Sequence, residues 1–412
     1  MVSVFSKVPK YTLANPPSFY ANRAIEEYAR KASRQVTLKQ LVVFGRSVNE
    51  DKLLKSANYV RNELPIRLSR RIRDIQNLPF IVGSNPHIEF IYHLYYNAFE
   101  KFRRIPPISN LEDNHEFYLL LREMLLAHNQ VVSELALGIR ETAHHMNPHQ
   151  ADKFLSDMIK SRIGRRVIAQ QHMAYSEEWY GDREKVDGII GLVHTDMSAY
   201  RTVQKVCNLV GKLFREQYHI SPPKVIIDGH KDASLTYIPR HLEFILFETL
   251  KNAMQHTVYS HTDAKLLWDQ DSGSPQRPPK MAEETLETAF EATSSPCDSN
   301  NVTEFSDLPP IRVTIGDCST DVMFRVSDQG GGIAKDIIDR VWSFFYLTER
   351  NMMQSEQRRL NRTRMGLGMG LAMSRAYADY WGGSLTLASM HGYGTDAYIK
   401  ISKENLKEQI PI

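Results

Sequence analysis

The chain has 412 residues, of which 42% are hydrophobic and 24% charged, enough for two to three globular domains. Its 51 basic and 48 acidic side chains nearly cancel, so no general basic field points to nucleic acid as a partner. The cysteines are odd in number and widely spaced, which argues against a disulfide framework or a zinc site and favours a reducing compartment. They are Cys207, Cys297 and Cys318.

The N-terminal segment fits two interpretations equally. Residues 1–25 contain no Asp or Glu but include Lys7, Lys10 and Arg23, as in a transit peptide or in an ordinary frayed terminus. No apolar run reaches the roughly 18 residues of a membrane span. We therefore predict a soluble protein in which residues 1–19 are a flexible N-terminus or the remnant of a targeting segment.

Residues 20–220 show mainly helical patterns. The capping-box spacing of Ser47 and Glu50 predicts the start of a long helix, and apolar residues recur along it at steps of three and four as far as Ile75. Similar runs lie at 121–139, 154–172 and 206–214. Long helices joined by short links predict a four-helix-bundle-like domain over residues 20–220.

The pattern changes after the Ser-Pro-Pro segment at 221–223. Short β-like runs follow at 225–227, 311–315 and 322–326, mixed with helices and glycine loops, so we expect a second domain over residues 221–412. Residues 269–307 carry nine acidic side chains and few large apolar groups. We interpret this segment as a disordered acidic insert, with a docking or regulatory loop as the alternative.

Four short segments of the second half carry candidate chemistry. In the first, Glu248 and Asn252 lie four positions apart on a predicted helix over 242–254, which places them on one side, a turn apart. An amide oxygen can ligate Mg²⁺, and a neighbouring carboxylate can accept a proton. A solvated helix face would show the same spacing.

The second segment is Asp328-Gln-Gly-Gly-Gly, which follows the β-like run 323–326. Three glycines at the end of a strand let the backbone approach a ligand closely, and an aspartate before them can accept a hydrogen bond from an exocyclic amine such as that of adenine. A plain turn is the alternative.

The third segment is Gly366-Leu-Gly-Met-Gly370, directly before a helical stretch over 371–381. Glycines at a helix N-terminus expose amide hydrogens and the positive end of the helix dipole, which suit a polyphosphate. The stretch 349–365 carries five arginines and two glutamates, and suits either a mobile lid over phosphates or a solvated loop. The fourth segment, 392–396, lies between strand-like runs at 384–389 and 397–401. It is predicted to be a glycine-containing hairpin turn in which Thr395 can contact a base.

Together and in this order, the four segments resemble the nucleotide-binding boxes of the Bergerat-fold (GHKL) ATPases and kinases. The sequences at 237–254, 327–332 and 366–385 resemble more narrowly the mitochondrial 2-oxoacid dehydrogenase kinases, which act on pyruvate or branched-chain 2-oxoacid dehydrogenase. Residues 33–46, 61–72, 128–139 and 161–172 resemble the helical regulatory domain of that family. The implied fold is a two-domain α+β protein: a helical bundle followed by a Bergerat α/β sandwich with a mixed sheet.

The resemblance implies a kinase that transfers the γ-phosphate of ATP to a serine of the decarboxylase α subunit and inactivates the complex. By matching position, Glu248 would be the general base, Lys251 would neutralise phosphoryl charge, Asn252 would ligate Mg²⁺ and Asp328 would bind adenine. The other implied nucleotide-pocket residues are Gly330, Gly332, Thr348, Gly366, Leu367, Gly368, Met369, Gly370, Gly394 and Thr395. A K⁺ ion is a further implied cofactor.

The resemblance also implies the mitochondrial matrix as the location, a homodimer, and docking to the lipoyl-bearing transacylase core, with no nucleic acid and no membrane span. Two positions depart from the pyruvate-specific pattern. Phe244 stands where those kinases usually carry a histidine, and the chain ends at Ile412 without their extended tail. Both departures lean toward the branched-chain enzyme, but pyruvate dehydrogenase is favoured as the commoner target.

Other activities remain as alternatives. A Bergerat ATPase that drives conformational change would normally place its ATP module first, and a histidine kinase would need an acceptor box, which His128 and His172 lack. We expect both histidines to be structural. Arg162, Arg165 and Arg166 could contribute to an anionic-metabolite pocket in the helical domain, as the resemblance implies, but the local pattern favours a solvated helix face.

Overall fold

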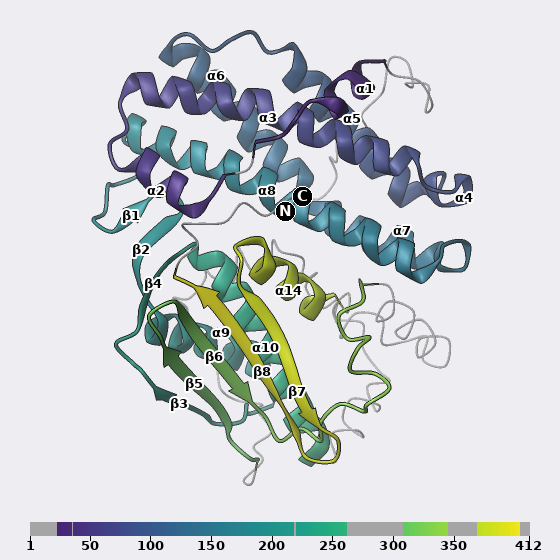
Figure 1. Cartoon of the computed structure of the whole chain (residues 1–412), viewed down its shortest axis with the longest axis vertical. Coiled ribbons are helices and arrows are strands. Elements are labelled where there is room, and N and C mark those ends of the chain that lie inside the picture. Colours follow the sequence, from purple (N-terminus) through teal and green to yellow (C-terminus); the bar gives the residue numbers. More distant parts are fainter. Residues whose placement is uncertain (1–22, 35, 218–219, 262–307, 345–368, 404–412) are drawn as a thin grey trace, which may run out of the picture.

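The computed structural model describes residues 23–34, 36–217, 220–261, 308–344 and 369–403. A helical layer lies above a five-stranded mixed sheet, and further helices cover one face of that sheet (Figure 1). The predicted α+β architecture is therefore confirmed. The acidic insert and the arginine-rich stretch 349–365 lie outside the described residues.

The helical layer contains long helices with extensive mutual packing: α3 packs on α5 and α8, α5 on α7, and α6 on α8. Its elements are α1 (Arg23–Arg30), α2 (Leu38–Gly45), α3 (Glu50–Gln76), α4 (Phe80–Gly83), α5 (Pro86–Arg104), α6 (Leu111–Ala127), η1 (His128–Gln130), α7 (Val131–Glu141), η2 (Ala143–His145) and α8 (Pro148–Tyr180).

Helix α3 shows why the apolar spacing predicts this layer. Its residues at steps of three and four, from Leu53 to Ile75, are buried against neighbouring helices. The predicted cap was wrong, however: α3 begins after Asn49, whose side chain accepts a hydrogen bond from the Lys52 amide. Asparagine serves this role as well as serine, and it stands immediately before the first helical residue.

Two predicted helical runs also differ from the structure. The run at 121–139 is divided into α6 and α7 by the 3₁₀ turn η1. The run at 206–214 belongs to α9 (Ala199–Gln217), which packs against α10 (Pro239–His261) beside the sheet. Apolar periodicity identifies a helix but not the partner that its face packs against.

The main sheet has the strand order β3-β5-β6-β8-β7, with β3 and β5 parallel and the other pairs antiparallel. The alternate residues Val322, Phe324 and Val326 are buried, while Met323 between them is exposed, so only one face carries the core. The predicted strands are confirmed. They are β3 (Val225–Gly229), β5 (Ile311–Asp317), β6 (Asp321–Ser327), β7 (Ser384–Met390) and β8 (Gly394–Ser402).

A second, three-stranded sheet, which was not predicted, joins β1 (Ile189–Ile190), β2 (Val193–Ser198) and β4 (Ser234–Tyr237). Its strands are short and lack a clear alternating pattern. Helix α14 (Gly370–Tyr380) packs against both α10 and α8, so it connects the sheet-bearing part to the helical layer (Figure 1). Among the described residues, no helix has the length and apolar character that crossing a membrane requires.

Candidate active site

Glu248 and Lys251 form a close ion pair on α10. The Lys251 Nζ lies 2.6 Å from Glu248 Oε1 and 2.7 Å from Oε2, and the Glu248 side chain is largely buried. A Cβ atom at Gly370 would overlap the Glu248 carboxylate, so the first residue of α14 lies directly against this carboxylate. Two of the four predicted segments therefore meet at Glu248.

Asn252 lies one turn beyond Glu248 on the same helix and is half-buried. Its side-chain amide makes no hydrogen bond to any residue that the structure describes. Buried or half-buried amides normally have such partners, so this group is available for a ligand.

Asp328 is held by two backbone amides. Its Oδ1 accepts hydrogen bonds from the amide of Gly330 at 2.8 Å and from that of Thr395 at 3.3 Å. Burial raises the pKa of the Asp328 carboxyl, while these two amides oppose the rise. Because Oδ1 accepts both of these hydrogen bonds, the second carboxylate oxygen, Oδ2, can accept a hydrogen bond from an amine.

The glycines of the second and fourth segments permit close backbone contacts. A Cβ at Gly330 would overlap His256 on α10, one at Gly394 would overlap the Asp328 carbonyl, and one at Gly332 would overlap the Met390 carbonyl. Gly332 also has a positive φ of 70°, which other residues rarely adopt. The second segment is thus packed between the end of α10 and the β7–β8 hairpin.

Ser389 is a polar residue at this site that sequence reasoning missed. Its Oγ lies 2.9 Å from Thr395 Oγ1 and accepts a hydrogen bond from the Ile333 amide at 2.7 Å. Ser389 and Thr395 are cross-strand partners in the β7–β8 hairpin. The predicted hairpin register would have identified the pair, because opposite residues of antiparallel strands lie side by side.

The third segment is described only in part. Thr348, Gly366, Leu367 and Gly368 lie outside the described residues, whereas Met369 and Gly370 lie inside them. Met369 is buried and precedes α14 without a side-chain cap on the helix. The first amides of α14 therefore have no side-chain acceptor among the residues that the structure describes, and they can serve an anion.

The chemistry of these residues fits a magnesium nucleotide. Among the described residues no group of three or more His, Cys, Asp or Glu side chains could hold a metal ion. Within the part of the chain that the structure describes, the Asn252 amide has no partner, and Mg²⁺ commonly combines few protein ligands with substrate phosphates. Glu248, Asn252 and the start of α14 thus bring together a carboxylate, a side-chain amide and helix N-terminal amides, which are group types that can accept a proton, ligate Mg²⁺ and bind phosphate.

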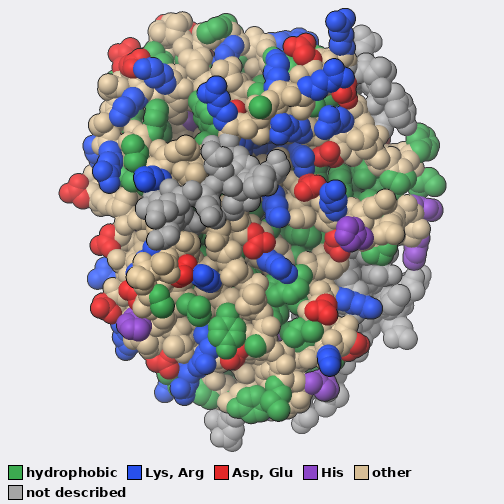
Figure 2. All heavy atoms as spheres, in the orientation of Figure 1, with side chains coloured by type: hydrophobic (Ala, Val, Ile, Leu, Met, Phe, Trp, Pro, Cys, Tyr) green, Lys and Arg blue, Asp and Glu red, His purple; other side chains and the backbone are tan. Residues whose placement is uncertain are grey.

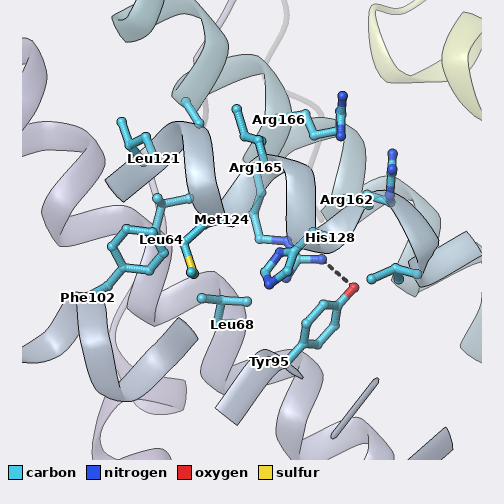
Figure 3. A pocket seen from close by; sticks show the side chains of 13 residues that line it. Leu64, Leu68, Tyr95, Phe102, Leu121, Met124, His128, Arg162, Arg165 and Arg166 are labelled. Carbon is cyan, nitrogen blue, oxygen red and sulfur yellow. Dashed lines mark hydrogen bonds between the residues drawn. The ribbon is translucent and has the colours of Figure 1, made fainter. Parts of the chain in front are cut away.

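A second cluster of functional groups lies inside the helical layer. Arg162 and Arg165 on α8 are buried and, with Arg166, line a cavity of about 40 Å³ (Figure 3). The preference for a solvated helix face was therefore wrong, because α8 packs inside the layer. Arg165 donates to the Tyr95 hydroxyl at 2.7 Å, and its Nη1 has no hydrogen-bond partner among the described residues. This excess of positive charge is suited to an anion.

His128 and His172 are structural, as expected. Burial, with Arg165 and Arg162 nearby, lowers the pKa of His128 to about 3. Burial alone lowers the pKa of His172 to about 3, and its Nδ1 lies 3.2 Å from Ser56 Oγ. Both rings are therefore neutral at physiological pH.

Two protein families match different parts of the sequence. A family described as mitochondrial branched-chain alpha-ketoacid dehydrogenase kinase matches residues 35–194. A second family, described as histidine kinase-, DNA gyrase B-, and HSP90-like ATPase, matches residues 280–405.

Similar curated proteins cover most of the chain. A mitochondrial pyruvate dehydrogenase (acetyl-transferring) kinase of Arabidopsis thaliana is 30% identical over 375 residues, which are 89% of this chain and 90% of that protein. Pyruvate dehydrogenase (acetyl-transferring) kinase 2 of Saccharomyces cerevisiae is 27% identical, with 94% of this chain and 86% of that protein covered. Isozyme 4 of the kinase from Mus musculus is also 27% identical, with 95% and 86% covered.

Proposed function

The chain belongs to the mitochondrial 2-oxoacid dehydrogenase kinase family, and on that premise we propose that it phosphorylates a serine of the decarboxylase α subunit of a 2-oxoacid dehydrogenase complex. The enzyme is a kinase that uses ATP. One observation carries the proposal: Glu248 meets the first residue of α14, one turn from Asn252, whose amide has no hydrogen-bond partner among the described residues.

Glu248 acts as the general base in this proposal. It accepts the proton of the serine hydroxyl as the hydroxyl oxygen attacks the γ-phosphorus and the bond to the β-phosphate oxygen breaks. Lys251, which holds both carboxylate oxygens, would balance charge that develops on the transferred phosphoryl group. Phosphoryl transfer depends mainly on positioning and charge neutralisation, and base catalysis adds roughly 10²- to 10⁴-fold.

The nucleotide is held by residues from three segments. Asp328 Oδ2 accepts a hydrogen bond from the adenine amine, and Thr395 lies beside Asp328. The first backbone amides of α14 bind the phosphates. Mg²⁺ would be held by Asn252 and would neutralise the phosphate charge. Thr348, Gly366, Leu367 and Gly368 are proposed to complete the pocket on the strength of the resemblance, and K⁺ remains a proposal on the same ground.

We favour pyruvate dehydrogenase as the substrate. The curated relatives reported above are named pyruvate dehydrogenase kinases, and a branched-chain kinase is the alternative because the family that matches residues 35–194 bears that name. Phe244 also leans toward the branched-chain alternative. The relatives are named mitochondrial, and we propose the matrix as the compartment where the kinase docks to the lipoyl-bearing core.

We also propose that the chain forms a homodimer. The face of the main sheet turned away from the helices exposes Ile226 and Met323, and hydrophobic side chains are visible on this lower part of the molecule (Figure 2). None of the described elements covers this face, and we propose that Ile226 and Met323 on it contact the second copy.

Labelled ATP tests the function directly. The purified chain is incubated with γ-labelled ATP and Mg²⁺, together with separately purified pyruvate or branched-chain dehydrogenase complex. We expect acid-stable label on a serine of the α subunit, with faster labelling of the pyruvate enzyme. Faster labelling of the branched-chain enzyme would reverse the substrate assignment. Acid-labile label on the chain itself would instead indicate a histidine kinase and overturn the proposal.

A further inference from the structure

Helices α10 and α14 contact each other at three levels along their length. At one end Gly370 lies against Glu248, and in the middle the rings of Phe244 and Tyr377 have centroids 5.0 Å apart. At the other end the indole Nε1–H of Trp381 donates a hydrogen bond of 2.8 Å to Nδ1 of His241. His241 lies on α10 two turns before Glu248, so the helix with the proposed base also carries this acceptor.

The Trp381–His241 hydrogen bond lies in an apolar environment. Trp381 is only 5% exposed, its ring contacts that of Tyr380 at a centroid distance of 4.8 Å, and the His241 ring lies 4.8 Å from that of Tyr377. Little water competes for the bond at such a site, and an indole N–H has no role other than donor. The bond also requires the His241 tautomer with its proton on Nε2.

The start of α14 depends on how the rest of the helix is held. No side chain in the described ranges caps this start, whereas the end of the helix continues through Trp381 and Gly382 into β7. The eleven residue steps from Gly370 to Trp381 correspond to about 16 Å along a helix axis, so a tilt of about 4° at Trp381 moves Gly370 by about 1 Å. A displacement of about 1 Å can lower a reaction rate by about 100-fold.

We propose that Trp381 and His241 are positioning residues, whose hydrogen bond holds the phosphate-binding end of α14 in register with Glu248. Neither residue touches the reacting atoms. The inference rests on the proposed function, because the consequence of misplacing α14 is expressed in phosphoryl transfer.

The variant Trp381→Phe removes the N–H and keeps a large ring, and His241→Leu removes the acceptor. We expect each to lower kcat by about 10-fold while the Kd for an ATP analogue with Mg²⁺ changes by less than about 3-fold. The double variant should be no slower than either single one, because both changes remove the same bond. His241→Gln retains an acceptor and should recover most of the rate.

Trp179→Phe is the matched control, since Trp179 is 39% exposed on α8 and far from this contact in the sequence. Two results would overturn the inference: a kcat for Trp381→Phe within about 2-fold of the control, or multiplicative losses in the double variant. A loss of rate that merely follows a lower Tm, without recovery in His241→Gln, would also reduce the pair to a structural role.

The indole N–H resonance of Trp381 gives a readout without a protein substrate. It is assigned by its absence in Trp381→Phe, and we expect it to shift when an ATP analogue and Mg²⁺ are added, while that of Trp179 does not. If the nucleotide binds and this signal is unmoved, the positioning inference fails and the proposed function stands. If no nucleotide binds, the proposed function itself fails.

Discussion

Glu248 shows how a single side chain is prepared for chemistry by its surroundings. A carboxylate that is largely buried needs a compensating charge, and Lys251 supplies it on both oxygens. Phe244, one turn earlier, packs against Tyr377 and offers no hydrogen bond. Lys251 is therefore the charged partner that the described residues provide, where the pyruvate-specific kinases usually add a histidine.

Replacing Glu248 by Gln tests its role as the base. Glutamine keeps the size of the side chain and cannot accept the serine proton, so we expect turnover to fall by roughly 10²- to 10⁴-fold while Mg-ATP affinity is retained. Asn252→Ala is the contrasting variant: it should abolish Mg-ATP binding. Both are measured by calorimetric titration with Mg-ATP and by initial rates. Unchanged turnover in Glu248→Gln would exclude Glu248 as the base.

At the scale of elements, the site depends on where helices and strands begin and end. Gly370 is the first residue of α14 and lies against the Glu248 side chain of α10. Gly330 and Gly394 allow the second and fourth segments to make close backbone contacts. A side chain at any of these positions would separate the elements. The glycines therefore act here by allowing close approach, and Gly332 by its positive φ.

The variant Gly370→Ala should separate α14 from α10. The added methyl group would overlap the Glu248 carboxylate, so we expect kcat to fall at least about 10-fold and the affinity for Mg-ATP to weaken. Gly211→Ala on α9 is the matched control. A Cβ there would have ordinary contacts of 3.6 Å, and alanine should stabilise the helix by roughly 0.5–1 kcal/mol. Wild-type kinetics in Gly370→Ala would contradict the assigned contact.

For the whole molecule, α14 is the element that joins the candidate site to the helical layer. Tyr380 at its end is half-buried next to Arg67 of α3, and burial of its hydroxyl raises the pKa of that group. Gly164 on α8 lies between Arg162 and Arg165, and a side chain there would overlap both Arg67 and Tyr380. The arginine-lined cavity and the candidate active site are therefore linked through packed neighbours.

The helical layer should lose stability in mild acid. The folded pKa values of His128 and His172, about 3, lie below the ordinary value of 6.5, so the unfolded chain binds more protons between those limits. Their contribution to stability is present above pH 6.5 and is lost as the pH falls toward 3. The loss is about 1.4 kcal/mol per pH unit for each histidine.

Urea unfolding followed by circular dichroism at pH 7.5 and pH 5.5 measures this effect. The free energy of unfolding should be lower at pH 5.5, and His172→Leu should reduce the difference, whereas exposed His144→Gln should leave it unchanged. An equal difference in His172→Leu and in the wild type would show that His172 does not contribute.

The order of the four candidate segments, and most of the elements that carry them, could be predicted from the sequence. Periodicity and glycine placement are local properties, and they predicted α3, α10, α14 and all five strands of the main sheet. The resemblance then gave the expected role of each residue in the site.

The surfaces that pack against one another could be identified only from the folded chain. The contact of Glu248 with Gly370, the pair of Ser389 with Thr395, and the burial of Arg162 and Arg165 each depend on residues far apart in the chain. The same is true of α9, which packs beside the sheet. Local sequence patterns fix the backbone of an element, but burial and hydrogen bonding depend on the elements that pack against it.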